Sequence, residues 1–256
     1  SICSYCLTEP GSGSDANGMK TKGRPDISNS SLNISGSKSF ISGAGESDLY
    51  FVMMKTEINS SNETSCVIIE KNSPGISFGK NEDKMGWKNQ PTRIVSFDKC
   101  VVPFENILGS PGEGFKIAMQ GLDGGRINIA SCSLGAARFC IDKCISYISE
   151  RKQFGRFLKD FQSIQFKLAD MITDYTAARL MVHEAAKALD KNQNDTTAKS
   201  AMAKKFATDV CYNICNEALQ IHGGYGYLSE YGIEKMVRDC RVHQILEGTN
   251  EIMRLI

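Results

Sequence analysis

The stretch IQFKLADMITDYTAARLMVHEAAKAL, residues 164–189, decides the fold of this 256-residue chain. Its apolar residues recur every three or four positions, which aligns their side chains along one face of an α-helix. A helix of this length with one apolar face buries that face against other helices. The apolar face consists of Ile164, Leu168, Met171, Ile172, Tyr175, Ala178, Val182, Ala186 and Leu189.

Two neighbouring stretches have the same period. One helix is predicted to start after Asn194 or Asp195 as N-cap and to end at Gly223-Gly224. An earlier helix is predicted from about residue 115 to residue 150, and glycines within it let a ligand or another backbone approach closely. Long helices with short connections indicate an antiparallel, four-helix-type bundle over residues 109–256. The stripe of the later helix is Met202, Phe206, Val210, Ile214, Ala218 and Ile221.

Residues 1–108 have a different period. Short apolar or alternating runs occur at 32–37, 48–54, 65–69 and 93–97, bounded by Gly, Asn, Ser and charged residues. No helical stretch lies between them, so an antiparallel β-sandwich or barrel is expected. The predicted fold class is therefore α+β with two domains, a β-domain over 1–108 and a helical bundle over 109–256, joined by a hinge at 109–114.

Composition sets limits on function. The formal net charge is +1, so no global field attracts nucleic acid or an anionic membrane. No run of about 18 apolar residues is present, so no transmembrane segment is predicted. Ten cysteines without a plausible disulfide framework favour a reducing compartment, and the lone Cys3/Cys6 pair does not supply the four ligands of structural zinc. No metal site is expected.

Two motifs in the β-domain point to a ligand. TEPGSGSD, residues 8–15, combines closely spaced glycines with hydroxyl groups, so backbone amides can converge on an anion or on the edge of a flavin. A plain Ser/Gly turn is the alternative. SFISGAG, residues 39–45, follows a predicted strand and places an aromatic ring and a hydroxyl two residues apart. A simple strand end is equally compatible with this second motif.

Three motifs in the helical half carry further chemistry. RKQFG, residues 151–155, offers a cation, an amide and an aromatic ring at a helix-to-helix turn, or a solvated basic turn. QIHGGYGY, residues 220–227, can admit a pyrophosphate, or it can be a glycine stop for the helix. LEGTNE, residues 246–251, is predicted to start a last helix. There Glu247 is either a general base with a raised pKa or an acidic residue that favours the helix dipole.

The order of these motifs resembles that of the acyl-CoA dehydrogenase family over essentially the whole chain. The matching pieces are YCLTEPGSGSD (5–15), FIS (40–42), RKQFG (151–155), QIHGGYG (220–226) and EGTNE (247–251). The resemblance implies the family's middle β-domain and C-terminal helical bundle. We expect that the family's N-terminal helical domain and any targeting segment are not part of this chain.

The resemblance also implies a site for FAD and acyl-CoA. Glu247 is the implied catalytic base, and Asp123, Gly124, Gly125, Arg126 and Ser14 are the implied substrate-binding residues. The paired glycines would leave room near the pantetheine or the acyl chain. The implied FAD-binding residues are Tyr5, Cys6, Leu7, Thr8, Gly13, Ser14, Phe40, Ile41, Ser42, Arg151, Gln153, Phe154, Gln162, Gln220, Ile221, His222, Gly223, Gly224, Thr249, Asn250 and Glu251.

The implied reaction is the α,β-dehydrogenation of a short branched-chain acyl-CoA. Glu247 would remove the α-proton, and FAD would take up the β-hydrogen as hydride. The resemblance further implies a homotetramer in the mitochondrial matrix that passes electrons to electron-transfer flavoprotein. Two alternatives stay open at this point: an acyl-CoA oxidase that returns electrons to oxygen, and a truncated, non-catalytic form of the dehydrogenase.

Overall fold

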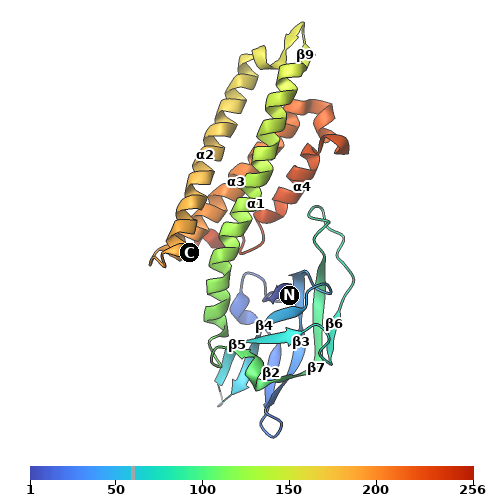
Figure 1. The fold of residues 1–256 in the computed structure, drawn as a ribbon, viewed down its shortest axis with the longest axis vertical. Coiled ribbons are helices and arrows are strands. Elements are labelled where there is room, and N and C mark those ends of the chain that lie inside the picture. The colour runs from blue at the N-terminus through green and yellow to red at the C-terminus, as the bar shows by residue number, and fades with distance from the viewer. Residues whose placement is uncertain (59–60) are drawn as a thin grey trace. The chain divides into compact units, whose positions relative to one another are not determined.

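The computed structural model describes every residue except 59 and 60, and it divides into two compact units (Figure 1). The first unit contains Ser1–Lys84 and Lys88–Gly121, and the second contains Met85–Trp87 and Leu122–Ile256. The predicted division between residues 108 and 109 stays a prediction about domain organisation. Among the described residues, no helix is long and apolar enough to cross a membrane.

The first unit is built on a mixed sheet with the strand order β6-β7-β3-β2-β4-β5-β8. The paired strands β3–β7, β4–β5 and β2–β3 are antiparallel, as predicted, whereas β1 and β2 each pair with β4 in parallel. The strands are β1 (Cys3–Cys6), β2 (Lys22–Asp26), β3 (Ser31–Ser42), β4 (Leu49–Ile58), β5 (Ser61–Glu70), β6 (Ile76–Phe78), β7 (Thr92–Pro103) and β8 (Ile107–Leu108), with 3-10 turns at Ala16–Gly18 and Phe104–Asn106.

Alternation along the strands explains the core of this unit. In β3, Leu32, Ile34 and Ile41 are buried, and they pack with apolar residues of β4, β5 and β7. The pairing of β3 with β7 shifts register between Lys38 and Ile41. At this bulge Phe40 has a φ of 58° and its side chain is 72% exposed. The motif expected after a strand therefore lies at the end of β3 itself.

The second unit is helical. Its long elements are α1 (Gly114–Glu150), which begins within the first unit, and α2 (Gln162–Asp190), α3 (Thr196–His222) and α4 (Ile233–His243). Between α1 and α2 lie the strands β9 (Lys152–Gln153) and β10 (Arg156–Phe157) and a 3-10 turn at Leu158–Asp160. Further 3-10 turns span Gly223–Tyr227, Ser229–Tyr231 and Ile252–Arg254. The α+β fold class is thereby confirmed.

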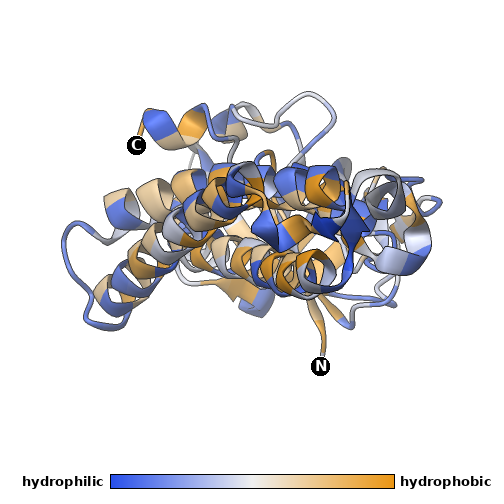
Figure 2. Ribbon diagram, turned by 90° about the horizontal axis from the view of Figure 1, so that it is seen from above, coloured by the Kyte–Doolittle hydropathy of each residue, from blue (hydrophilic) through white to orange (hydrophobic). Residues whose placement is uncertain are grey.

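The helix ends follow the signals in the sequence. Asp195 is the N-cap of α3, and its carboxylate forms an ion pair with Lys199 at 3.2 Å. Gly223 ends α3 with a φ of 59°, a conformation that favours glycine. Each helix carries both hydrophilic and hydrophobic residues along its length, as Figure 2 shows. The apolar residues meet in one core that combines large aliphatic side chains and alanines with buried thiols, including Cys140, Cys211 and Cys215.

The structure corrects two local predictions. Residues 246–251 do not start a last helix: α4 ends at His243, and the residues that follow form a loop before the 3-10 turn at Ile252–Arg254. The stretch 151–155 belongs to a β9–β10 hairpin rather than to a direct helix-to-helix turn. All ten cysteines lie within the described residues and are free, and no group of metal-ligating side chains is found among those residues.

Candidate active site

The loop after α4 presents Glu247. The turn closes through hydrogen bonds from the Leu246 N–H to the Val242 carbonyl (3.0 Å) and from the Asn250 N–H to the Gln244 carbonyl (3.0 Å). Glu247 has a φ of 57° and Gly248 a φ of 88°, so two successive residues adopt the left-handed conformation. This conformation is unfavourable for glutamate and persists only where the surroundings hold it.

The Glu247 carboxylate lies against α1 at Gly125. A Cβ atom at position 125 would lie 2.5 Å from Oε2 of Glu247, so only a glycine leaves room for the carboxylate in this position. Burial raises the pKa of the Glu247 carboxyl above its usual range, and the charges of Arg126 and Lys204 oppose that rise. The loop position excludes the alternative role as a helix-dipole residue, because no helix begins at Glu247.

Arg126 is buried beside Glu247. Its Nε lies 3.5 Å from the Glu247 carbonyl oxygen, and its Nη1 donates to Oδ1 of Asp123 at 2.8 Å. Oδ2 of Asp123 accepts a hydrogen bond from the Thr197 hydroxyl at 2.7 Å. Among the described residues, no lysine or arginine nitrogen forms an ion pair with the Glu247 carboxylate within 4.0 Å. The arginine therefore contacts the backbone of Glu247 rather than its carboxylate.

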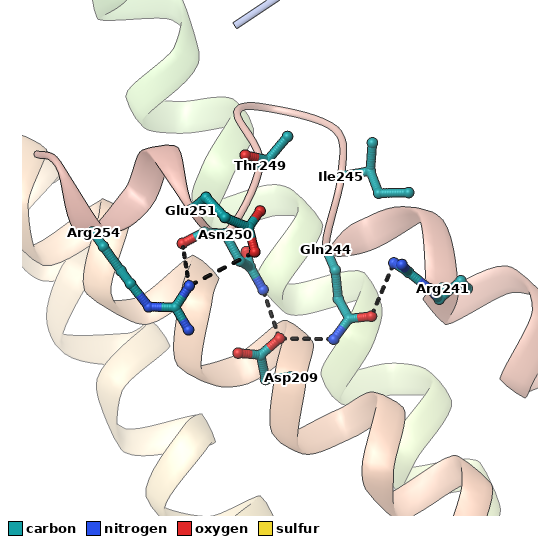
Figure 3. Close-up of a pocket in the computed structure, with 8 residues that line it drawn as sticks. All are labelled: Asp209, Arg241, Gln244, Ile245, Thr249, Asn250, Glu251 and Arg254. Atoms are coloured by element: carbon teal, nitrogen blue, oxygen red, sulfur yellow. Dashed lines mark hydrogen bonds and ion pairs between the residues drawn. The ribbon is translucent and has the colours of Figure 1, made fainter.

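The other side of the loop is tied to α3. Asn250 is buried, and its Nδ2 donates to Oδ1 of Asp209 (2.7 Å) and to the Thr208 hydroxyl (2.9 Å). Gln244 also donates to Oδ1 of Asp209 at 2.7 Å. A cavity of about 160 Å³ opens next to this network (Figure 3). It is lined by Asp209, Arg241, Gln244, Ile245, Thr249, Asn250, Glu251 and Arg254.

A second cavity, of about 400 Å³, brings together six of the predicted FAD-binding residues. Arg151 and Gln153 reach it from the end of α1 and from β9, and the segment 221–224 reaches it from the end of α3. Gly223 and Gly224 face open space, since an added Cβ atom would meet no atom within 4 Å. The lining residues are Tyr147, Arg151, Gln153, Leu158, Ile221, His222, Gly223, Gly224, Tyr225 and Leu228.

His222 lines this cavity and is held in place by two neighbours. His222 stacks on Tyr147 at a ring-centroid distance of 4.3 Å, and its Nδ1 lies 2.8 Å from the Ala218 carbonyl oxygen. Burial lowers the pKa of His222, so its imidazole is neutral at pH 7. Phe154, which is 93% exposed, and the exposed Gln162 and Gln220 do not line the cavity.

In the first unit, two predicted motifs lie side by side. Glu9 and Ser12 exchange backbone hydrogen bonds across a tight turn, and the Ser39 N–H donates to the Thr8 carbonyl at 2.8 Å. This bond joins the 8–15 turn to the bulge that carries Phe40. Gly11 and Gly13 face open space. Lys38 of β3 forms a buried ion pair of 2.8 Å with Glu9 and so ties the turn to the sheet.

The predicted ligand-binding residues of the first unit divide into two groups. Tyr5, Gly13, Ser14, Phe40 and Ser42 are exposed, and Thr8 is half-buried, so their side chains or backbone can meet a ligand. The remaining three have buried side chains, which leaves only their backbone for such a contact: Cys6, Leu7 and Ile41.

Sequence reasoning missed two residues of the site. Both lie on α3: Lys204 contacts Gly248 and Asn250 in the loop that carries Glu247, and Thr197 contacts Asp123. A lysine within a helix normally indicates a solvent-exposed face, so the residue type did not predict that Lys204 is buried in the site. The signal available was its position among alanines, in the stretch SAMAKKFA at 200–207, where Ala201, Ala203 and Ala207 surround it.

The middle-domain family model of acyl-CoA dehydrogenases matches residues 4–100, and the C-terminal-domain model matches residues 112–256. The chain belongs to the acyl-CoA dehydrogenase family, as the order of motifs predicted.

The chain is similar to several known members of this family. It is 54% identical over 255 residues to mitochondrial isobutyryl-CoA dehydrogenase of Bos taurus, covering 100% of this chain and 61% of that protein. Butyryl-CoA dehydrogenase from Megasphaera elsdenii superposes with a TM-score of 0.95 at 41% identity, over 99% of this chain and 66% of that one. An acyl-CoA dehydrogenase complexed with FAD from Bacillus anthracis gives a TM-score of 0.93 at 35% identity, over 99% and 46%. The chain thus spans about 61% of the curated bovine relative.

Proposed function

We propose that this chain belongs to an FAD-dependent dehydrogenase that converts isobutyryl-CoA to methacrylyl-CoA, a step of valine catabolism. The observation that carries the proposal is the half-buried Glu247 carboxylate, which lies against α1 at Gly125 and whose pKa is raised. A carboxylate with a raised pKa is an effective general base near neutral pH. The 54% identity to bovine isobutyryl-CoA dehydrogenase supports a short branched acyl chain as substrate.

The roles of this chain's residues follow from the loop geometry. Glu247 removes the α-proton of the thioester, and Gly125 provides the space in which its carboxylate lies. The Glu247 N–H donates no hydrogen bond within the described part of the chain. It is therefore available to the thioester carbonyl, where a donor stabilises the developing enolate. Arg126 contacts the Glu247 carbonyl and is held by Asp123. Asp123, Gly124, Gly125, Arg126 and Ser14 are proposed as contacts of the acyl-CoA.

The residues present fit FAD. A cation, an amide and two unobstructed glycines meet in the 400 Å³ cavity of the second unit, which suits an anionic diphosphate. In the first unit the exposed Phe40 ring lies beside an open turn, which suits a flat aromatic group. When bound, FAD supplies the acceptor for the β-hydrogen. The residues proposed to hold it, across subunits of a homotetramer, are those named for FAD in the sequence.

The remaining parts of the proposal concern the cell. Electron-transfer flavoprotein is the proposed electron acceptor, and the mitochondrial matrix is the proposed location. The mitochondrial origin of the bovine relative supports this location.

The test is an acyl-CoA panel with a dye acceptor, applied to the FAD-loaded protein. Isobutyryl-CoA is expected to give the highest kcat/KM among isobutyryl, 2-methylbutyryl and butyryl thioesters. Glu247→Gln is expected to bind FAD and lose about 10²–10⁴-fold in kcat, the usual contribution of a positioned base. Glu230→Gln, which removes an exposed carboxylate, is the control. Near-normal turnover of Glu247→Gln would reject the assignment, and a colourless preparation would favour the non-catalytic alternative.

Electron transfer to oxygen is tested in the same preparation. Reduced enzyme that stays reduced in air but reoxidises with electron-transfer flavoprotein fits the dehydrogenase. Rapid reoxidation by oxygen would favour the oxidase.

A further inference from the structure

Lys204 is a fully buried lysine, 0% exposed, in the middle of α3. Its Nζ donates to the Gly248 carbonyl at 2.7 Å and to Oδ1 of Asn250 at 2.9 Å. Both acceptors belong to the loop that carries Glu247. Lysine is almost never fully buried without a partner. Here no carboxylate oxygen lies within 4.0 Å of Nζ in the described ranges 1–58 and 61–256, so its charge is directed at two oxygens of this loop.

Asn250 makes the contact two-sided. Its Oδ1 accepts from Lys204, while its Nδ2 donates to Thr208 and Asp209 on the same helix. Because acceptor and donor are both used, the amide has one orientation and the loop has one position along α3. The contacts recur at one-turn spacing, at positions 204 and 208.

The backbone between these contacts needs such support. Glu247 and Gly248 are both left-handed, and glutamate does not keep that conformation unaided. The oxygen that Lys204 binds is the carbonyl of Gly248, the residue directly after the base. Movement of this carbonyl would rotate the peptide between Gly248 and Thr249, change the backbone angles of Gly248, and so allow the carboxylate of the preceding residue to shift away from Gly125.

We propose that Lys204 is a positioning residue that holds the loop 247–250 through the Gly248 carbonyl and Asn250, and so fixes the Glu247 carboxylate over α1. The catalytic consequence rests on the proposed function. The tie between helix and loop does not depend on it.

The charges around Lys204 give a second signature. Burial lowers the pKa of Lys204 to about 8, while Asp209, Glu247 and Glu251 raise it and Arg126 lowers it. Reciprocally, Lys204 and Arg126 are the positive charges that hold down the pKa of Glu247. Asp123 is next to Arg126 and is already paired with it. Removing the lysine charge therefore raises the pKa of the base.

The experiment compares the variants Lys204→Met, Lys204→Arg and Asn250→Ala with wild type, all loaded with FAD. Hydrogen exchange is measured without acyl-CoA, and turnover is measured with it. Lys199→Met is the matched control, because it removes the same charge from the same helix at an ion pair with Glu184 and Asp195. The first readout is amide hydrogen exchange of peptides covering 244–251, with peptides from 164–189 as internal reference.

Exchange in 244–251 is expected to rise about tenfold or more in Lys204→Met, because an opened loop loses protection locally. The reference peptides and Lys199→Met are expected to match wild type. Unchanged exchange in 244–251 would overturn the proposal. An equal rise across the helices would assign Lys204 a general structural role and would overturn it too. If Lys204→Met does not fold, the same hydrogen-exchange comparison is made with Asn250→Ala, and the same outcomes support or overturn the proposal.

The second readout is the pH profile with isobutyryl-CoA. In Lys204→Met, kcat is expected to fall about 10²-fold, as for a base displaced by about 1 Å, with KM little changed. The acid limb of kcat/KM is expected to move to higher pH, and Lys204→Arg to restore part of the rate. An unchanged acid limb with normal kcat would overturn the positioning role. A protein inactive with every acyl-CoA would refute the proposed function. The hydrogen-exchange result would still show whether Lys204 holds the loop 247–250 against α3.

Discussion

Gly125→Ala separates the geometry of the base from the stability of the fold. An added Cβ atom would lie 2.5 Å from Oε2 and 2.9 Å from Cδ of Glu247. Ordinary van der Waals contact begins at 3.4 Å, so the carboxylate oxygen has to retreat by about 0.9 Å. The atoms that move are the far end of a flexible side chain, so the backbone of α1 can stay in place.

The two consequences have opposite signs. Alanine is a better helix former than glycine by about 1 kcal/mol, so the unfolding free energy is expected to stay the same or to rise by up to that amount. A displacement of nearly 1 Å at a reacting group costs about 10²-fold in rate. The variant is therefore expected to be as stable as wild type and about 10–100-fold slower in kcat.

The assay pairs denaturant unfolding with dye-coupled turnover of isobutyryl-CoA. Gly135→Ala is the matched control, because it lies in the same helix and an added Cβ atom there meets nothing within 4 Å. It should gain the same helix propensity and keep full activity. Normal kcat in Gly125→Ala would refute the placement of the carboxylate against α1. A large loss of stability would show that the backbone, not the side chain, yields.

Three further outcomes are expected from substitutions at buried or half-buried positions. Glu247→Gln is expected to raise the unfolding free energy by about 0.5–2 kcal/mol at pH 8, as at other active sites where function costs stability. Because the folded pKa of this carboxyl is raised, wild type loses stability as pH rises through it, so the difference should shrink as pH falls toward 4.5 in denaturant titrations. Lys38→Met is expected to cost about 3–5 kcal/mol by leaving Glu9 buried and unpaired, and the double variant with Glu9→Gln should recover part of it in the same titrations. Gly86→Ala would place a Cβ atom 2.5 Å from a backbone carbonyl of α4, so a loss of about 1–3 kcal/mol and a red shift of the emission of Trp87, the single tryptophan, are expected.

Periodicity predicted the helices because their apolar faces are long. The stripe at 164–189, the N-cap signal at 194–195 and the glycine stop at 223 were sufficient to place α2 and α3. The 11-residue α4 was missed because it is short and rich in charged residues, so its apolar residues repeat too few times to show a helical period. Parallel pairing of β1 and β2 with β4 was also invisible, since strand direction depends on partners distant in the sequence.

The site was predictable only in part, for a related reason. Motif order singled out Glu247 as the proposed base, because this residue lies in a short local motif. The conformation of the loop comes from α1 and α3, which are far away in the chain. Lys204 looks like any lysine in a helix until the structure buries it against the Gly248 carbonyl.

Both buried cations near the base contact main-chain oxygens of its loop: Arg126 faces the carbonyl of Glu247, and Lys204 faces the carbonyl of Gly248. A direct ion pair with the carboxylate would have lowered its pKa and occupied the lone pairs that must accept a proton. Placing each positive charge on the backbone instead fixes a strained loop while the carboxylate keeps its raised pKa. The same arrangement predicts that Glu247 costs stability, because its carboxylate is half-buried and the two cations contact the backbone beside it rather than the carboxylate.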